Sequence, residues 1–177
     1  VIRGALAWQD YSATGGADLA AAYLEPTRHD NAHLRDADAT GLLNCSAESP
    51  GGCNTPPAGA GHHIVDWFPA PSGAMFRNSQ HQSVNNAFGV RGLRALAALA
   101  RVLAAAGGGD DRARRAAGAG PDYARLAAQY DGEADDLLGA MRALMWNATD
   151  RRWCDGACAD VEDHHGVTTS AWLLYLG

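Results

Sequence analysis

Two stretches of helical periodicity limit what this chain can fold into more than any other feature of its sequence. In the first, apolar side chains recur at intervals of three, four or eight residues, at Val84, Phe88, Leu96, Leu99 and Leu103. The glycines at 107–109 end this stripe, as glycine commonly does at a helix C-terminus. A second stripe follows Pro121, at Tyr123, Leu126, Tyr130, Leu137, Met141 and Leu144. This spacing places apolar side chains on one helical face, so it predicts two long helices joined by a turn.

The rest of the chain adds shorter helical patterns and one long irregular segment. Residues 1–14 and 17–39 predict helices, the second interrupted or kinked at Pro26, and Val167–Leu176 predicts the start of another. Residues 40–80 hold most of the prolines and show no sustained period, so they predict a long functional loop. Brief pieces around Ile64 and Trp153 are the only candidates for strand. We therefore predict an all-α array of antiparallel helical hairpins, which could form a bundle, a solenoid or a closed toroid.

Charge and hydropathy exclude two classes of partner. The 177 residues carry a formal net charge of −6, and the arginines are spread out, whereas a phosphate backbone needs clustered positive charge. No apolar run approaches the roughly 20 residues of a membrane span. We therefore expect neither a nucleic acid nor a membrane as partner, and no cofactor. Helical and apolar patterns run up to both ends, so we expect an internal part of a larger domain.

Four cysteines fall in two local pairs. Cys45 and Cys53 bracket a loop rich in Ser, Pro and Gly, and Cys154 and Cys158 bracket a shorter one. Local pairs of this kind predict two small disulfide-closed loops and an oxidising compartment. The alternatives for the second pair are free thiols and a zinc site completed by the histidines at 164 and 165. Because neighbouring histidines rarely aim at one ion, we expect disulfides and no metal.

Two N-glycosylation sequons lie beside the cysteine pairs. They begin at Asn44 (Asn-Cys-Ser) and at Asn147 (Asn-Ala-Thr). Such a sequon marks a surface loop of a secreted protein. Together with the cysteines, they predict a protein of the secretory pathway that is glycosylated at Asn44 and Asn147.

Short motifs spread over nearly the whole chain carry a family resemblance. They are Leu-Ala-Trp-Gln-Asp-Tyr-Ser-Ala-Thr-Gly-Gly-Ala-Asp at 6–18, Asp-Ala-Thr-Gly-Leu-Leu at 38–43, Ile-Val-Asp-Trp at 64–67, Asn-Asn-Ala-Phe at 85–88, Leu-Met-Trp-Asn at 144–147, Trp-Cys-Asp-Gly at 153–156 and His-His-Gly-Val-Thr-Thr at 164–169. In this order they resemble segments of α-L-rhamnosidase catalytic domains, glycoside hydrolase family 78. The resemblance implies an (α/α)6 toroid of which residues 1–177 form part of a single catalytic domain. It also implies inverting hydrolysis of terminal α-L-rhamnosides.

The same resemblance assigns sugar-binding residues but no catalytic ones. The family's general acid lies upstream of the region that matches Val1, and its general base lies downstream of Gly177. Asp66 would accept hydrogen bonds from adjacent sugar hydroxyls, as carboxylates do, and Trp67 would stack on a pyranose. Arg77 and His165 are further candidates for contact with the carbohydrate. The alternatives are a loop-capping role for Asp66, a buried anchor at Trp67, and an exposed or helix-capping His165.

Two other functions are also compatible with the sequence. One is another six-hairpin glycosidase, of the trehalase or glucoamylase kind, because a shared fold does not decide the substrate. The other is a non-catalytic helical protein that binds carbohydrate or acts as a scaffold. The lack of any repeat of fixed period counts against a solenoid scaffold.

Overall fold

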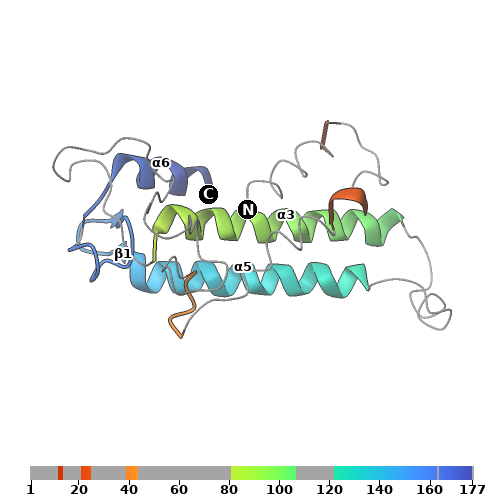
Figure 1. The fold of residues 1–177 in the computed structure, drawn as a ribbon, viewed down its shortest axis with the longest axis horizontal. Coiled ribbons are helices and arrows are strands. Elements are labelled where there is room, and N and C mark those ends of the chain that lie inside the picture. The colour runs from red at the N-terminus through yellow and green to blue at the C-terminus, as the bar shows by residue number, and fades with distance from the viewer. Residues whose placement is uncertain are drawn as a thin grey trace, which may run out of the picture. The chain divides into compact units, whose positions relative to one another are not determined.

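Three helices and a short β-hairpin make up most of the part of the chain that the structure describes. In this computed structural model, the described residues are 12–13, 21–24, 39–43, 81–106, 122–162 and 164–176. They form α3 (Ser83–Ala106), α5 (Tyr123–Met145), β1 (Trp146–Asn147), β2 (Arg152–Trp153) and α6 (Val167–Leu176) (Figure 1). Residues 12–13 and 21–24 are also helical. The described part is thus mostly helical, as predicted, whereas the predicted loop beyond residue 43 lies outside it.

The two long helices occupy the stretches that periodicity predicts. α3 ends at Ala106, just before the three glycines. α5 begins after Asp122, whose Oδ1 accepts a hydrogen bond from the N–H of Arg125 at 3.0 Å. The carbonyl of Asp122 accepts a second bond, from the N–H of Leu126 at 2.9 Å. Asp122 is therefore the N-cap of α5, a position that Asp fills well because its side chain satisfies an otherwise unpaired amide.

The chain divides into two compact units, and α3 and α5 each run through both. The first unit comprises Val1–Ala32 and Arg91–Asp135, and the second comprises His33–Val90 and Asp136–Gly177. Among the described residues, no helix combines the length and the apolar character that crossing a membrane requires.

In the first unit, α3 and α5 lie side by side and run in opposite directions (Figure 1). Arg94 of α3 forms ion pairs with Asp131 at 3.0 Å and Asp135 at 2.6 Å of α5, and Arg101 also pairs with Asp131. Exposed pairs of this kind contribute at most about 1 kcal/mol each. The main stabilisation comes from buried apolar side chains, which include Leu96, Leu99, Leu103, Leu126 and Tyr130. The predicted helical hairpin is thus present.

The second unit contains the β-hairpin and α6. β1 pairs with β2 in antiparallel register, Trp146 opposite Trp153 and Asn147 opposite Arg152. The turn between the strands is closed by Asn147, whose Oδ1 accepts hydrogen bonds from the N–H of Thr149 at 2.9 Å and of Asp150 at 3.1 Å. The buried apolar side chains of this unit include Leu42, Leu43, Val84, Leu137, Met141, Met145, Val161 and Leu173.

One position of the predicted α5 stripe is wrong. Leu144 is 39% exposed, and Met145 beside it is fully buried. Met145 follows Met141 by four residues, so it continues the apolar face where α5 ends and the hairpin begins. Position 144 matches the helical period as well as 145 does, so periodicity could not decide which side chain points inward.

Gly41 and Gly139 form a matched pair for testing how the segment 39–43 packs against α5. Gly41 has a φ of +76°, and a Cβ added there would lie 3.3 Å from the Cβ of Ala140. We expect Gly41→Ala to destabilise the protein by about 1–2 kcal/mol, because L-residues are strained in this left-handed region. Gly139 lies inside α5 with open space around it, so Gly139→Ala should stabilise by up to about 1 kcal/mol. Denaturant unfolding measures both, and an unchanged midpoint for Gly41→Ala would contradict the described packing.

Candidate functional site

The buried polar side chains of the described residues all belong to the second unit. They lie at the start of α3, in the turn after β2 and in α6: His81, Gln82, Ser83, Asn86, Asp155 and Thr169. Burying a polar group is unfavourable unless it is hydrogen-bonded. Such a cluster therefore marks the place where specific polar contacts, rather than apolar packing alone, determine the structure.

Asp155 is the centre of this cluster. Its side chain is fully buried, and its Oδ2 lies 2.7 Å from Nδ1 of His164. Its Oδ1 accepts two hydrogen bonds of 2.7 Å, from the N–H of Gly166 and the hydroxyl of Thr169. Hydrogen bonds to an ionised acceptor are about twice as strong as neutral ones. Three such donors offset the cost of burying the carboxylate.

Asp155 also supplies the start of α6 with a cap from a distant part of the sequence. The carbonyl of Gly166 accepts the first helical bond, from the N–H of Ser170 at 3.2 Å, so Gly166 is the N-cap residue. α6 has no acidic residue in its own first turn. The Asp155 carboxylate binds the N-cap amide and a side chain of the first turn, and it places negative charge at the positive end of the helix dipole.

The start of α3 is bound to the same turn. The N–H of Ser83 donates to the carbonyl of Asp155 at 2.8 Å, and the Ser83 hydroxyl donates to the carbonyl of Cys154 at 2.6 Å. Gln82 forms an antiparallel β-bridge with Gly156. The turn after β2 therefore connects α3 and α6.

The predicted pairing of Cys154 with Cys158 is confirmed, with a disulfide joining the two sulfurs. These sulfurs consequently cannot act as thiolate ligands of zinc. The loop that they close is also held to the end of α5, since the N–H of Cys154 donates to Met145 O and that of Cys158 to Leu144 O, both at 2.8 Å.

Asn86 connects the residues that flank the long predicted loop. Its Oδ1 accepts a hydrogen bond from the N–H of Leu43 at 2.8 Å, and its Nδ2 donates to the Leu43 carbonyl at 3.3 Å. The same Nδ2 donates to the carbonyl of Gln82 at 2.9 Å. One fully buried amide in the first turn of α3 thus holds both Leu43 and Gln82. Leu43 and Gln82, which flank residues 44–81, are therefore held close together by one side chain.

Several of the predicted site residues lie outside the described residues. These are the sugar-binding candidates Asp66, Trp67 and Arg77, the cysteines Cys45 and Cys53, and the sequon residue Asn44. Their predicted roles stay predictions. Asn147 is described, and it lies at the start of a turn whose next three residues are exposed.

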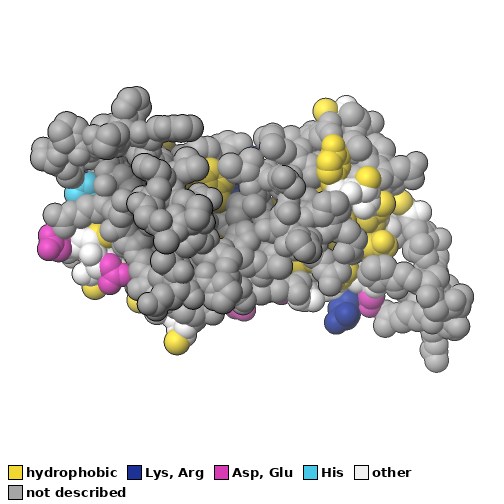
Figure 2. Space-filling model, viewed as in Figure 1, with side chains coloured by type: hydrophobic (Ala, Val, Ile, Leu, Met, Phe, Trp, Pro, Cys, Tyr) yellow, Lys and Arg dark blue, Asp and Glu magenta, His cyan; other side chains and the backbone are white. Residues whose placement is uncertain are grey.

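His165 is described and lies against the β-hairpin. Its Nδ1 is 3.0 Å from the carbonyl of Trp153, and its Nε2 is 3.4 Å from Oδ2 of Asp150. Because a carbonyl only accepts, Nδ1 of His165 is the donor. The carboxylate of Asp155 fixes Nδ1 of His164 as a donor in the same way. Figure 2 shows a histidine and acidic side chains on the surface at the end where Figure 1 labels β1.

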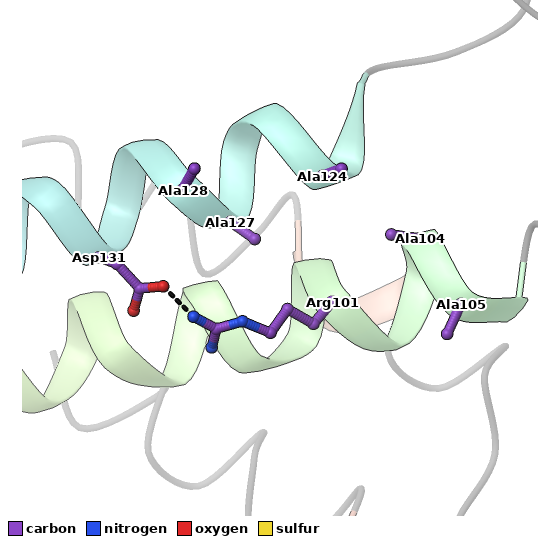
Figure 3. Close-up of a pocket in the computed structure, with 7 residues that line it drawn as sticks. All are labelled: Arg101, Ala104, Ala105, Ala124, Ala127, Ala128 and Asp131. Atoms are coloured by element: carbon purple, nitrogen blue, oxygen red, sulfur yellow. Dashed lines mark hydrogen bonds and ion pairs between the residues drawn. The ribbon is translucent and has the colours of Figure 1, made fainter.

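A separate hollow of about 570 Å³ lies in the first unit, between α3 and α5 (Figure 3). Five alanines line it, together with Arg101 and Asp131, and the guanidinium of Arg101 points at the carboxylate of Asp131. These two charges neutralise each other, and none of the predicted site residues lines the hollow. The hollow therefore lacks the converging polar groups that mark a binding site.

Among the described residues, no group of three or more His, Cys, Asp or Glu is arranged to hold a metal ion.

Sequence reasoning noticed the two central residues of the site without finding their roles. Asp155 belongs to the Trp-Cys-Asp-Gly motif, and Asn86 belongs to the Asn-Asn-Ala-Phe motif at the start of α3. The feature of the sequence that could have indicated their burial is that each is a polar residue beside apolar positions of a predicted element. With both oxygens engaged inside the fold, Asp155 is a positioning residue and is not suited to exchange protons with a substrate.

The comparisons with known proteins return no match for this chain, whether among protein-family models, curated proteins or solved structures.

We predict that Asp155→Ala lowers the free energy of unfolding by about 3 kcal/mol, because it removes the acceptor of three donors, two of them fully buried. Asp160→Ala is the matched control. Its carboxylate is 47% exposed and lies 3.6 Å from Nδ1 of His81, so its loss should change stability by less than about 1 kcal/mol. Denaturant unfolding of the two variants gives the comparison, and equal destabilisation would contradict a special role for Asp155.

Proposed function

We propose that this chain is part of the catalytic domain of a secreted glycoside hydrolase of the α-L-rhamnosidase type. In this proposal, α3, α5 and α6 are helices of an (α/α)6 toroid, built from antiparallel hairpins. The observation that supports it best is the cluster around Asp155. Three of the resembling motifs, at 144–147, 153–156 and 164–169, are joined there to the start of α3 by hydrogen bonds.

The proposed role of this chain is to form one wall of the sugar pocket. Leu43 and Gln82 are both held by Asn86, which gives the loop bearing Asp66 and Trp67 a fixed base. We propose that Asp66 accepts hydrogen bonds from sugar hydroxyls and that Trp67 stacks on the ring, with Arg77 beside them.

Inverting hydrolysis needs two carboxyl groups about 6.5–9.5 Å apart, one to protonate the leaving oxygen and one to activate water. Asp155 is a poor candidate for either, because it is buried and fully bonded. Following the family resemblance, we propose that the acid and the base lie in other segments of the domain.

Sugar binding by this chain tests the proposal. We expect L-rhamnose to bind in preference to D-glucose and trehalose, and Asp66→Asn to weaken binding by about tenfold through loss of a charged hydrogen-bond acceptor. Trp67→Ala should also weaken it, and Asp160→Asn serves as the control. Isothermal titration calorimetry measures each affinity.

The alternatives predict other results in the same experiment. Preference for trehalose or glucose would indicate another six-hairpin glycosidase, and a lack of binding to any sugar would favour a scaffold. We also expect no turnover of aryl α-L-rhamnosides by this chain alone. Turnover that Asp66→Asn abolishes would refute our proposal that the catalytic pair lies elsewhere.

We further propose that the protein passes through the secretory pathway and carries a glycan on Asn147. The disulfide at 154–158 and the exposed turn at 148–150 support this proposal. Expression with a secretion signal in a eukaryotic host should give a glycan on the Asn147 peptide, removable by peptide N-glycosidase. Asn147→Gln and Thr149→Ala should both abolish it, whereas Thr149→Ser should retain it. An unmodified Asn147 in the secreted wild-type protein would contradict the proposal.

A further inference from the structure

Two tryptophans form an exposed aromatic pair on the β-hairpin. Trp146 and Trp153 lie opposite each other in the β1–β2 ladder, with ring centroids 5.3 Å apart and ring planes at 64°. This edge-to-face contact stabilises the short ladder. Trp146 nevertheless remains 37% exposed. An indole has a large apolar face, so this is a substantial apolar surface left in contact with water.

Polar groups lie directly beside this pair. His165 bonds through Nδ1 to the carbonyl of Trp153, and its Nε2 is 3.4 Å from a carboxylate oxygen of Asp150. The side chain of Asp150 is 53% exposed, so the oxygens of its carboxylate can be reached from solvent. An indole face, a carboxylate and an imidazole therefore lie around one turn of the chain.

The base of the hairpin that carries these groups is also held by contacts outside them. The disulfide at 154–158 and the hydrogen bonds from Cys154 and Cys158 to the end of α5 fix its base. Asp155 and its partners fix the segment that leads into His165. Neither the exposed part of Trp146 nor the carboxylate of Asp150 is required for these contacts. The groups are thus preorganised, which reduces the entropy lost when a ligand binds.

The chemistry of this surface matches a neutral sugar ring. The C–H face of a pyranose packs on an indole, and the hydroxyls at the ring edge donate to a carboxylate. A sugar acid fits less well, because its carboxylate would be repelled by Asp150.

We propose that Trp146 and Asp150 form an accessory subsite for a neutral pyranoside, separate from the loop that carries Asp66 and Trp67, and that His165 positions the carboxylate of Asp150. The choice of carbohydrate as the ligand class rests on the proposed function. The residues come from the geometry of the hairpin.

The indole N–H signals in an NMR spectrum of the 15N-tryptophan-labelled chain test this subsite. The chain has five tryptophans, which single Trp→Phe variants assign. Titration with methyl α-L-rhamnoside and methyl α-D-glucoside should shift the Trp146 signal in a saturable way. Asp150→Asn should weaken this binding by about tenfold, and glucuronate should bind more weakly than the neutral sugars.

Two variants separate the subsite from general effects on the hairpin. Sugar-induced shifts of the Trp153 signal should be lost in Trp146→Ala and kept in Leu144→Ala, which removes a side chain that is exposed to a similar degree at 39%. A Trp146 signal that no neutral sugar shifts would overturn the proposal. So would equal effects of the two variants, or equal binding of glucuronate.

This readout also separates failure of the subsite from failure of the proposed function. If neutral sugars shift the Trp146 signal while the complete catalytic domain of the proposal hydrolyses no rhamnoside, the hydrolase assignment fails and the subsite stands. If rhamnosides are hydrolysed while only the Trp67 signal responds to sugar, the subsite alone is wrong.

Discussion

The second unit of this protein depends on one buried carboxylate. Asp155 is fully enclosed and binds His164, Gly166 and Thr169, while its backbone carbonyl holds Ser83 at the start of α3. A carboxylate in a medium of low polarity is strongly unfavourable unless donors surround it. Asp meets this condition here because its two oxygens accept three bonds, whereas an asparagine offers a single acceptor oxygen. The carboxylate of Asp155 therefore connects the hairpin to α6, and the backbone carbonyl of the same residue connects it to α3.

Hydrogen bonds link the β-hairpin to the residues that flank the proposed sugar-binding segment. Asn86 holds Leu43 and Gln82, and Gln82 pairs in turn with Gly156, the neighbour of Asp155. Leu43, Gln82 and the hairpin are therefore parts of one hydrogen-bonded framework. Functional side chains on loops gain precision when the elements beneath them are rigid. In the account proposed above, this framework supports two sugar-contacting surfaces without itself taking part in proton transfer.

Much of the described fold could be predicted from the sequence because it depends on local patterns. The periodicity of α3 and α5, the glycines after Ala106 and the pairing of Cys154 with Cys158 all involve residues close together in the chain. Leu144 was predicted wrongly because two adjacent positions fit the helical period equally well.

The roles of Asp155 and Asn86 could not be predicted. Asp155 meets Ser83 across 72 positions of the chain, 155 minus 83, and Asn86 meets Leu43 across 43; no local pattern encodes such contacts. Of the predicted sugar-binding residues only His165 lies within the described part, where the hairpin explains its orientation.

Native-state hydrogen exchange measured residue by residue tests the central role of Asp155 most directly. The amides of Ser83, Cys154 and Gly166 donate to different parts of the framework. If the carboxylate connects these parts, the three amides exchange slowly with a common free energy of opening, and they lose protection together in Asp155→Asn. Exchange of the Gly166 amide at the rate of an unstructured peptide in the wild-type chain, or independent opening of the three amides, would contradict this account.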